Sequence, residues 1–600
     1  MSFCGDLLRV WCEKLLVFQV TSVDNPALRG GILCPACARI HGRCFDAIYP
    51  FMYLADADGD NRYLEAAKML FEWAENTVSR EDGSYVNDTN SDWKGTTVFS
   101  VIQLTEALTF HGHLLDSVTY ERWRQRIDGA ADFLCNFKEF EVCNINYRIA
   151  NSLAMLLCSE LLGEERYASR GRKLVRMAVE NISDNGILFG EGRPVSGSSR
   201  RGCRPVDIGY NLEESLPAFI QYAYASGDEE LKEIGKKALT RHLLFMLDDG
   251  GIDNSFGTRN YKWTYWGSRT SDGCTLGYLL AADGEPDFAA GAYKNLKLLA
   301  ACTHDGCLYG GLHTHEIGEY ACVHHAFSHA KVLAGILDRG LEGLLKKRRQ
   351  LDKKGEEKDR MPRMRLENTA YITETDTYLI PGREYTATFT GYDWEYVNLK
   401  GGHACGGTLT LLWHETAGLV LCGGMSRYIM REANNMQLPR FSRHECVTPR
   451  LESTASDGRT VYSSLYDDRF EMIFSETGAG TVITVKGMLM DINQNCPEEG
   501  QGAYHAEYRF EHNCVSVRIY VNQNARFILP MISGRTDNAV WDESGMTIEK
   551  RASRVCVNVE NGVFYLPYKS ERIYNLAPGV EAIKVEMVPD NGIIAFCISF

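Results

Sequence analysis

The sequence contains no apolar run long enough to span a bilayer, which takes about 20 consecutive apolar residues. Its opening stretch, MSFCGDLLRVWCEKLLVFQV, lacks a basic start and is interrupted by Asp6, Glu13 and Lys14. No cleavage site of small residues follows, so the stretch does not have the pattern of a secretory signal. We therefore expect a soluble, intracellular protein with no membrane partner.

An excess of positive charge is also missing. The formal net charge is -15 at pH 7, and Lys and Arg cluster only in the run from residue 346 to residue 365. Nucleic acid is bound mainly through cationic contacts with phosphates, so we expect no nucleic-acid partner. An acidic protein can still bind an acidic sugar through a few well-placed arginines.

A paired cysteine framework is the third absence. The 20 cysteines are scattered, and many lie in apolar helical runs, as do Cys135, Cys158 and Cys302. Secreted proteins rarely leave so many thiols unpaired, so this pattern predicts a reducing, cytoplasmic location.

The first part of the chain reads as helices. Heptad-like apolar spacing occurs in the ranges 62–76, 101–115, 149–162, 174–181, 216–225 and 330–337. A turn phrase recurs between them, as EDGSYVND near residue 81, DNGILFGEG near 184, DDGGIDNSFG near 248 and HDGCLYGGL near 304. Helix pairs with an equivalent turn at each repeat predict an α/α toroid over residues 1–345, with its loops gathered at one rim.

The character of the sequence changes after Asn368. Alternating or apolar runs rich in β-branched and aromatic residues follow one another to the C-terminus, in the ranges 371–379, 384–390, 407–413, 418–422, 470–474, 480–485, 506–510, 515–521 and 593–599. They predict an antiparallel β-sandwich over residues 368–600. Residues 346–367 are expected to be a solvated helix end and linker rather than a basic interaction patch, because opposite charges are interspersed there. The predicted fold class is α+β multidomain.

One long loop, from Asp184 to Leu216, carries an unusual density of ionisable groups. They are Glu191, Arg193, Arg200, Arg201, Arg204, Asp207 and Tyr210, with Glu213 and Glu214 at the start of the next helix. Long loops in compact domains are often functional, and Arg is the natural partner of a substrate carboxylate. The alternative is a rim loop of satisfied salt bridges, with the two glutamates as ordinary first-turn residues.

Three other stretches offer candidate side chains. Asn146 and Tyr147 stand at a helix start, where an amide donates to a carboxylate or merely caps the helix. The loop 257–272 holds Trp266 and Arg269 among other aromatic and basic residues, which suits a wall for sugar rings. His324 belongs to a histidine-rich segment, HTHEIGEYACVHHAFSHAK, for which packing or substrate contact is expected rather than a catalytic zinc.

A metal site is not expected from the N-terminal cysteines. Cys34, Cys37, His41 and Cys44 would lie along one face if their segment were helical, and one face cannot surround a tetrahedral ion. We therefore expect no cofactor, with a structural zinc as the alternative.

These motifs resemble those of the heparinase II/III-like polysaccharide lyases, which carry an α/α toroid followed by a β-sandwich. Asn146-Tyr147 resembles the family's Asn-His pair, and DNG…GEG…Tyr210 is similar to its phrase ending in the catalytic Tyr. GGHACGGTLTLLWHETAGLVLCGG, from Gly401, resembles its strand pair with an active-site histidine, here His403. Tyr147 stands where the family has His, and Ala404-Cys405 replaces its acidic follow-up.

The resemblance implies an enzyme that acts on uronic-acid glycans, with an oligosaccharide partner and a possible homo-oligomer. In a β-elimination, Asn146 and an arginine would neutralise the uronate carboxylate, and Tyr210 or His403 would remove the C5 proton. Tyr210 would return a proton to the leaving oxygen. The alternative is an exo-acting β-glucuronidase that uses paired carboxylates, Glu191 with Asp207 or Glu214. A non-catalytic glycan-binding protein is a third reading of the same residues.

Overall fold

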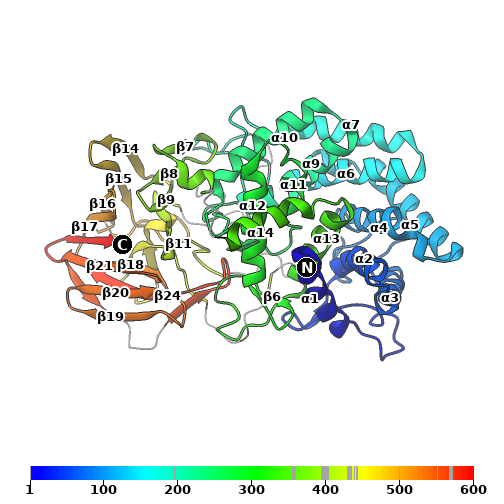
Figure 1. Cartoon of the computed structure of the whole chain (residues 1–600). Coiled ribbons are helices and arrows are strands. Elements are labelled where there is room, and N and C mark those ends of the chain that lie inside the picture. Colours follow the sequence, from blue (N-terminus) through cyan, green and yellow to red (C-terminus); the bar gives the residue numbers. More distant parts are fainter. Residues whose placement is uncertain are drawn as a thin grey trace.

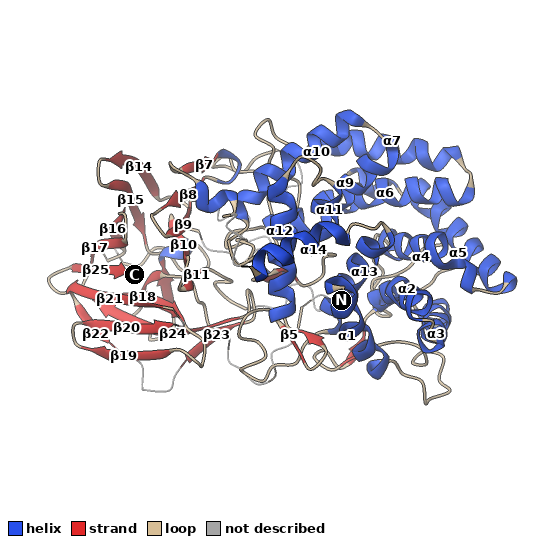
Figure 2. Ribbon diagram, viewed as in Figure 1, coloured by secondary structure: helices blue, strands red, loops and turns tan. Residues whose placement is uncertain are grey.

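The computed structural model describes residues 2–192, 197–354, 360–392, 405–428, 436–437, 440, 444–498, 501–550, 552–565 and 572–600. Helices make up the N-terminal half and strands the C-terminal half, and the two halves lie side by side (Figures 1 and 2). No helix in these ranges is both long and apolar enough to cross a membrane.

The helices form a closed ring of pairs. The inner helices are α2 (Ile48–Asp58), α4 (Thr97–His111), α6 (Ile145–Leu162), α9 (Leu216–Ser226), α11 (Thr275–Leu280) and α13 (Val323–Asp338). Each contacts the next in this order, and α13 contacts α2, which closes the ring. The outer partners are α3 (Asn61–Thr77), α5 (Ser117–Asn136), α7 (Glu165–Val179), α10 (Glu229–His242), α12 (Pro286–Ala301) and α1 (Phe3–Phe18). A further helix, α14 (Glu342–Lys353), packs on α12 and α1.

The two kinds of turn in the ring differ in length, which puts the long loops on one rim. The turn from α2 to α3 and the turn from α9 to α10 are short, with a left-handed glycine followed by an aspartate that caps the next helix. Four of the turns from outer to inner helices contain the recurring Asp-Gly or Asn-Gly phrase, and the turns from α1 to α2 and from α5 to α6 lack it. Three of them close on isolated β-bridges, Ser79 with Tyr85, Ile182 with Leu188 and Met246 with Ile252.

The C-terminal half contains three antiparallel sheets rather than one pair. The first has the order β11-β10-β9-β8-β7, the second β13-β12-β18-β24-β22 with β23 on β24, and the third β14-β15-β16-β17-β25-β21-β20-β19. The strands are β7 (Ala370–Ile372), β8 (Thr377–Pro381), β9 (Tyr385–Thr390), β10 (Thr408–His414), β11 (Gly418–Cys422), β12 (Arg450–Thr454), β13 (Val461–Ser463), β14 (Glu471–Thr477), β15 (Gly480–Met488), β16 (Ala503–Phe510), β17 (Cys514–Val521), β18 (Ala525–Ile532), β19 (Asn538–Asp542), β20 (Gly545–Lys550), β21 (Ser553–Asn561), β22 (Val563–Tyr565), β23 (Arg572–Asn575), β24 (Val580–Val588) and β25 (Ile593–Ser599).

The first sheet packs against the helical ring. Leu411, Trp413 and Cys422, from β10 and β11, belong to the same buried core cluster as the helices. Polar contacts cross the same boundary: Ser255 donates to Thr410 Oγ1 over 2.8 Å, and Tyr392 Oη donates to the carbonyl of Arg204 over 2.7 Å. The two halves therefore share a core and meet at the rim that carries the long loops.

The predicted fold class is confirmed: a helical toroid precedes a domain of antiparallel sheets. Each predicted helix range overlaps an observed helix, but α1, α2, α5, α10, α11 and α12 were not predicted. The run expected to be a helix end and linker begins with the end of α14, as predicted. Near the end of this run, Arg363 is fully buried against β9, where it donates to Thr386, Thr388 and the Ala387 carbonyl.

Candidate active site

The loop from Asp184 to Leu216 has two parts. Residues 197–202 lie mostly exposed, where Arg200 and Arg201 pair with Asp468 and Asp376, and the stretches around Glu191 and Asp207 fold inward. Gly190 and Gly192 have positive φ values, 107° and 101°, which glycine adopts without strain. They turn the chain so that Glu191 between them is fully buried. After residues 193–196, which lie outside the described ranges, Asp207 caps the short helix α8 (Ile208–Tyr210) by accepting from the amide of Tyr210 over 2.9 Å.

A π-helical turn, Asn211–Ser215, joins α8 to α9. Its two adjacent glutamates, Glu213 and Glu214, have different surroundings. Glu213 accepts from the Ser268 amide over 2.6 Å and from Ser271 Oγ over 3.0 Å, so it holds a neighbouring loop. Glu214 instead lines a cavity among the inner helices. Such turns inside helices are frequent at functional sites, because the extra residue re-aims the side chains around it.

Tyr210 lies between cationic groups. Its phenol oxygen accepts from Lys262 Nζ over 2.9 Å and is 2.5 Å from Thr270 Oγ1. The Arg259 guanidinium lies over its ring, 4.1 Å from the centroid. The side chain is only 3% exposed. Positive charge on two sides stabilises a phenolate oxygen relative to the neutral phenol.

Glu191 connects Tyr210 to Asn146 through Arg259. Arg259 Nη1 donates to Glu191 Oε1 over 2.5 Å, and the backbone amide of Asn146 is 3.4 Å from Glu191 Oε2. Burial raises the pKa of Glu191, and the charge of Arg259 opposes that rise. The side-chain oxygen of Asn146 has no hydrogen-bond partner among the described residues although it is buried. It is therefore free to accept from a ligand.

Asp207 has a structural position. One oxygen accepts from the Tyr210 amide, the other from the Arg259 amide over 2.7 Å, and Asn254 Nδ2 donates to both over 3.2 Å. Burial raises its pKa, while these hydrogen bonds lower it. Because both oxygens are occupied, Asp207 orients Tyr210 and Arg259 rather than contacting substrate.

Glu214 adjoins a buried group of four charges. Lys331 Nζ lies 2.7 Å from Asp46 and 2.8 Å from Asp272, and Arg43 Nη2 donates to the same two carboxylates over 2.6 and 3.2 Å. Burial raises the pKa of Glu214 well above its usual range, Asp272 adds to the rise, and Arg43 and Lys331 oppose it.

A small pocket lies next to Tyr210 and contains unpaired donors. It is lined by Cys37, His41, Arg269, Thr270, Cys322, His324, His325, Met436 and Gln437. Arg269 is 2% exposed, yet its Nε and Nη1 atoms have no acceptor among the described residues, and neither does Nε2 of His324. Burial, reinforced by Arg43, lowers the pKa of His324 well below its usual range, so its ring is neutral. A buried guanidinium with free donors in a pocket is what a carboxylate ligand requires.

His325 offers a hydrogen-bond acceptor to the same pocket, whereas Arg269 offers donors. Its Nδ1 lies 3.2 Å from the Leu308 carbonyl, which can only accept, so Nδ1 carries the proton. Burial lowers the pKa of His325 to about 3, so the ring is neutral and Nε2 offers a lone pair. Nε2 has no partner among the described residues and suits a sugar hydroxyl.

Three residues that were predicted to bind substrate do not line this pocket. Trp266 is fully buried, donates from Nε1 to the Tyr309 carbonyl over 2.8 Å and packs edge-on against His325 and His329. It supports the pocket from behind, so the predicted exposed aromatic wall is not seen in loop 257–272. Tyr147 is half-buried and accepts from Trp93 Nε1 over 2.9 Å. Arg204 is half-buried, lies over Phe189 and donates to the Gly197 carbonyl.

His403 lies outside the described residues, so its predicted place beside Tyr210 and Asn146 stays a prediction. Another sandwich histidine, His444, is described and reaches the pocket side. It accepts from the Leu576 amide through Nδ1 over 3.2 Å and stacks near Tyr428. Arg269 donates to the carbonyl of the same Leu576. The sandwich thus supplies backbone and ring contacts directly to the wall that carries Arg269.

Several site residues have no motif of their own. Lys262 and Thr270 lie with Arg259 in the loop singled out for its aromatic residues and arginines, and their partner Tyr210 lies more than forty residues earlier. Arg43, Asp46 and Lys331 have no motif around them and meet only because the ring closes. Their position in the singled-out loop could have identified the loop residues. No such signal marked Arg43, Asp46 and Lys331.

The N-terminal cysteines differ from expectation. Their segment is a hairpin of β1 (Leu33–Cys34) and β2 (Arg39–Ile40), not a helix. Cys34, Cys37 and His41 come together with Cys322, while Cys44 lies in the following 3-10 helix outside this group. The helical premise that argued against a metal was therefore wrong.

Comparison with known proteins places these features in one family. Residues 8–354 match the model described as the ulvan lyase N-terminal domain, and residues 370–600 match the ulvan lyase C-terminal domain. A broad-specificity ulvan lyase of Formosa agariphila is 34% identical over 597 residues, which cover 98% of this chain and 91% of that protein.

One solved structure shares the fold at low identity. A chondroitin AC lyase of Streptomyces coelicolor A3 in complex with chondroitin sulphate superimposes with a TM-score of 0.51 at 10% identity, covering 99% of this chain and 82% of that chain. A heparan sulfate lyase mutant from Pedobacter heparinus aligns with a TM-score of 0.48 at 10% identity, covering 100% and 83%. The matches of both halves and of the full-length relative show that the chain belongs to the ulvan lyase family.

Proposed function

We propose that this polysaccharide lyase cleaves a uronate-containing glycan by β-elimination, with the uronate carboxylate bound in the pocket beside Tyr210. The observation that carries the proposal is Arg269, a buried guanidinium with two donor atoms that have no acceptor within the described ranges. Leaving such donors unpaired in a protein interior costs free energy unless a ligand satisfies them. A planar carboxylate matches the fork of the guanidinium.

One residue, Thr270, connects the pocket to the phenol of Tyr210. Thr270 lines the pocket, and its hydroxyl lies 2.5 Å from the phenol oxygen of Tyr210. A uronate whose carboxylate contacts Arg269 and His324 would place its C5 carbon near that phenol. Asn146, joined to the same network through Glu191 and Arg259, is available to the far side of the sugar.

The chemical step needs no electron transfer. Neutralising the carboxylate makes the C5 proton more acidic, and a base removes that proton. The electron pair left at C5 forms the C4–C5 double bond, and the C4–O bond breaks. The leaving oxygen takes a proton and becomes the new chain end.

Tyr210 is suited to carry the proton in this step. As a phenolate, stabilised by Lys262 and Arg259, its oxygen can accept the C5 proton, and as a phenol it can donate to the leaving oxygen. A sandwich histidine at His403 or His444 would be the alternative base. Glu214 and its four charged neighbours support the site. One of these neighbours, Arg43, donates to the Thr270 carbonyl over 3.0 Å.

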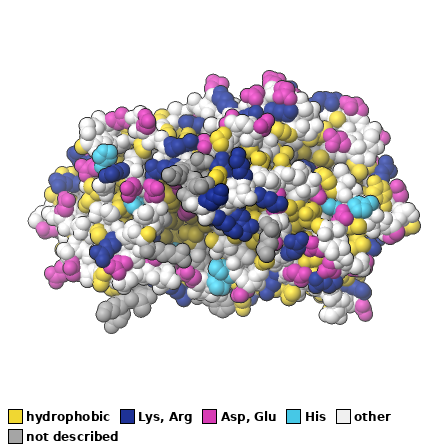
Figure 3. All heavy atoms as spheres, viewed as in Figure 1, with side chains coloured by type: hydrophobic (Ala, Val, Ile, Leu, Met, Phe, Trp, Pro, Cys, Tyr) yellow, Lys and Arg dark blue, Asp and Glu magenta, His cyan; other side chains and the backbone are white. Residues whose placement is uncertain are grey.

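For the substrate we propose an acidic polysaccharide of the ulvan type. The relative of known activity is described as a broad-specificity ulvan lyase, and 34% identity over nearly the whole chain supports a shared substrate class. Several Lys and Arg side chains lie near the middle of one molecular face, which suits an anionic chain (Figure 3).

The hydrolytic alternative fits the contacts less well. It needs two carboxylates that both reach the substrate. Asp207 accepts hydrogen bonds at both oxygens, and Glu191 is paired with Arg259, so neither is available as nucleophile or base. Glu214 then has no partner in the pair that a glucuronidase requires.

The experiment is an activity panel on the purified protein with ulvan, other uronate polysaccharides and simple glucuronides. Absorbance of the unsaturated uronate and reducing ends are followed together. Rising absorbance in step with reducing ends supports elimination. Reducing ends without absorbance would make the enzyme a glycosidase, and silence with every substrate would remove the support for the uronate reading.

A further inference from the structure

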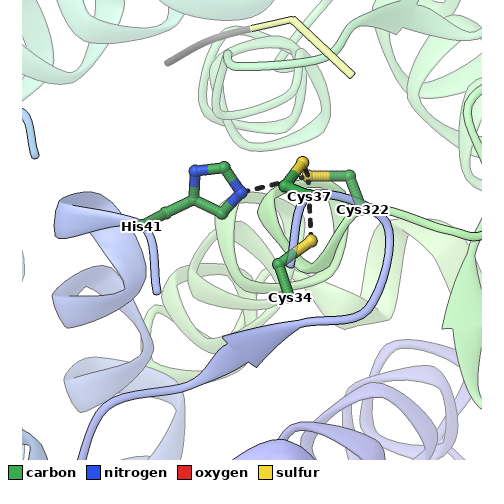
Figure 4. A group of neighbouring side chains, drawn as sticks. All are labelled: Cys34, Cys37, His41 and Cys322. Atoms are coloured by element: carbon green, nitrogen blue, oxygen red, sulfur yellow. Dashed lines mark hydrogen bonds between the residues drawn. The ribbon is translucent and has the colours of Figure 1, made fainter. Parts of the chain in front are cut away.

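Three cysteines and one histidine from opposite ends of the helical domain converge beside the candidate active site. Figure 4 shows Cys34, Cys37, His41 and Cys322 pointing toward a common centre. Their ligand atoms all lie within 4.8 Å of one another. Cys34, His41 and Cys322 are buried, and Cys37 is half-buried. Burial protects such a group from exchange with solvent.

The local fold explains how the first three residues reach one point. Cys34 ends strand β1, and the chain turns through CPAC, with the Ala38 amide donating to the Cys34 carbonyl over 2.9 Å. Ala38 has a left-handed φ of 52°, which completes the tight turn. The two thiols of a Cys-x-x-Cys turn then lie on the same side, as they do in zinc knuckles. His41 follows directly after β2 and turns back toward them.

The distances agree with a tetrahedral zinc. Cys322 Sγ lies 3.7 Å from Cys34 Sγ, 3.8 Å from Cys37 Sγ and 3.7 Å from His41 Nε2. Zinc–sulfur bonds of about 2.3 Å at tetrahedral angles put ligand atoms roughly 3.8 Å apart. A disulfide would need a sulfur–sulfur distance of about 2.05 Å, so none of these contacts is one. Simple packing of thiols gives no reason for four ligand atoms to face one point.

We propose that Cys34, Cys37, His41 and Cys322 bind one zinc ion as a structural Cys₃His site. Soft thiolates with one imidazole select zinc over the hard cations that prefer oxygen ligands. All four positions of a tetrahedral ion are filled by protein atoms, so the ion has no open position for water or substrate. Its role is to hold the fold and not to take part in the elimination.

The four ligands lie where the helical ring closes, between its first and last inner helices. Residues 34–41 lie between α1 and α2, and Cys322 immediately precedes α13, which contacts both helices. The ion therefore links the first and the last inner helices at the rim that faces the sandwich. Metal binding would add its free energy to folding, because the ligands are far apart in the unfolded chain.

The site also fixes one wall of the pocket. His324 lies two residues after Cys322 in the first turn of α13, and its ring packs edge-on against His41, with centroids 5.6 Å apart. Cys37, His41 and Cys322 themselves line the pocket that holds Arg269. The zinc would thus position His324 for substrate, although the metal proposal does not depend on the lyase activity.

The experiment measures the metal in the full-length protein, purified with reductant and without chelator. Elemental analysis is expected to give about one zinc per chain. X-ray absorption at the zinc edge is expected to show three sulfur ligands near 2.3 Å and one nitrogen near 2.0 Å. Both measurements use the wild-type protein, so they do not depend on a variant that folds.

A matched pair of variants then locates the ion. Cys37→Ser removes one half-buried ligand and should lower zinc content at least about tenfold, with a fall in Tm of about 5 °C or more. Cys307→Ser changes another half-buried cysteine, in the short hairpin before α13 but outside the group, and should keep the zinc. Loss of zinc in both variants would place the ion elsewhere.

Other results would overturn the proposal outright. A folded wild-type protein without zinc after expression in zinc-supplemented medium would do so. So would an absorption spectrum dominated by oxygen ligands, or iron with labile sulfide in place of zinc. Lyase activity is not needed for any of these outcomes, so failure of the metal site and failure of the proposed function are distinguishable.

Discussion

The phenol oxygen of Tyr210 has short polar contacts with Lys262 and Thr270. Its position depends on Asp207, which binds the backbone amides of both Tyr210 and Arg259. A single buried carboxylate thus orients the proposed proton carrier and the cation stacked on it. A substitution that removes only the phenol oxygen of Tyr210 is therefore expected to affect activity without disturbing this arrangement.

Tyr210→Phe removes only the phenol oxygen and should lower kcat/KM by about 100-fold or more, the usual contribution of a proton-transferring side chain. Tm should change little, because the ring still packs. The matched control is Tyr278→Phe in α11, another buried tyrosine, whose hydroxyl has no partner among the described residues. Activity of Tyr210→Phe within tenfold of wild type would exclude Tyr210 as the proton carrier.

At the scale of single residues the sequence pointed to some of the site and could not reveal the rest. Glu191 and Tyr210 stood out because their loop was dense in ionisable groups. Trp266 stood out because its loop is rich in aromatic residues. It is buried, because composition does not distinguish a residue that lines a pocket from one that packs behind it. Cys322 could not be paired with Cys34 at all, because nothing local marks a contact between residues nearly three hundred positions apart.

The hairpin turns between outer and inner helices decide where the candidate site is built. Each contains a glycine with positive φ, at Gly83, Gly186, Gly250 and Gly306. At Gly250 a Cβ atom would lie 2.3 Å from the Lys294 carbonyl oxygen, so the turn is packed directly against α12. The glycine is needed there for space as well as for its dihedral angles.

Gly250→Ala should therefore destabilise the fold by about 3 kcal/mol or more, because backbone must move in addition to the left-handed strain. Gly227→Ala provides the comparison, since Gly227 has a φ of 67° but open space around it. Its cost should be only about 1 kcal/mol. Urea unfolding measures both, and equal costs would contradict the close packing of the hairpin.

The end of α10 carries a buried histidine that couples stability to pH. His242 is fully buried, with Nδ1 donating to the Ala238 carbonyl over 2.9 Å and Nε2 accepting from Asn211 of the π-helical turn over 3.1 Å. Burial lowers its pKa from 6.5 to about 4. The unfolded chain then binds a proton below pH 6.5 that the folded chain does not, so acid favours unfolding.

The free energy of unfolding should fall between pH 7 and pH 5, with His242 contributing up to about 2 kcal/mol of the loss at pH 5. His242→Gln cannot titrate and should show a shallower slope, even if it is less stable at every pH. The slope is the readout, taken from urea unfolding at several pH values. An unchanged slope in the variant would show that His242 titrates normally.

At the scale of elements, amphipathic spacing revealed six inner or outer helices and the recurring turns, because one face of each is apolar. It missed α11, which is short and almost wholly buried, and α12, whose Ala-rich sequence has little contrast between faces. Strands β12, β13 and β18 to β24 were not predicted, although β18 is a largely apolar run and β24 alternates apolar and charged residues. The division into three sheets depends on long-range pairing that periodicity does not encode.

The two halves of the molecule are joined through a buried ion pair. Arg363 is fully buried, donates to three groups of β9 and lies 3.5 Å from Asp253 of the helical domain. Thr388 Oγ1 donates to the same aspartate over 2.5 Å. The pair fixes the sandwich to the rim that carries the site.

Arg363→Met should leave Asp253 buried without a cation and cost roughly 3–5 kcal/mol. The two halves should then unfold in separate calorimetric transitions. Arg365→Met is the control, because Arg365 is half-exposed and its pairing with Asp287 should be worth at most about 1 kcal/mol. A single transition of unchanged midpoint in Arg363→Met would show that the pair does not join the halves.

The central claim, β-elimination at a uronate, is tested most directly by the mass of the products formed in water enriched in heavy oxygen. Elimination adds no water across the cleaved bond, so every new non-reducing end should be an unsaturated uronate without the label. The same products should be missing with Tyr210→Phe and present with Tyr278→Phe. Saturated products that carry the heavy oxygen would show hydrolysis and contradict the account.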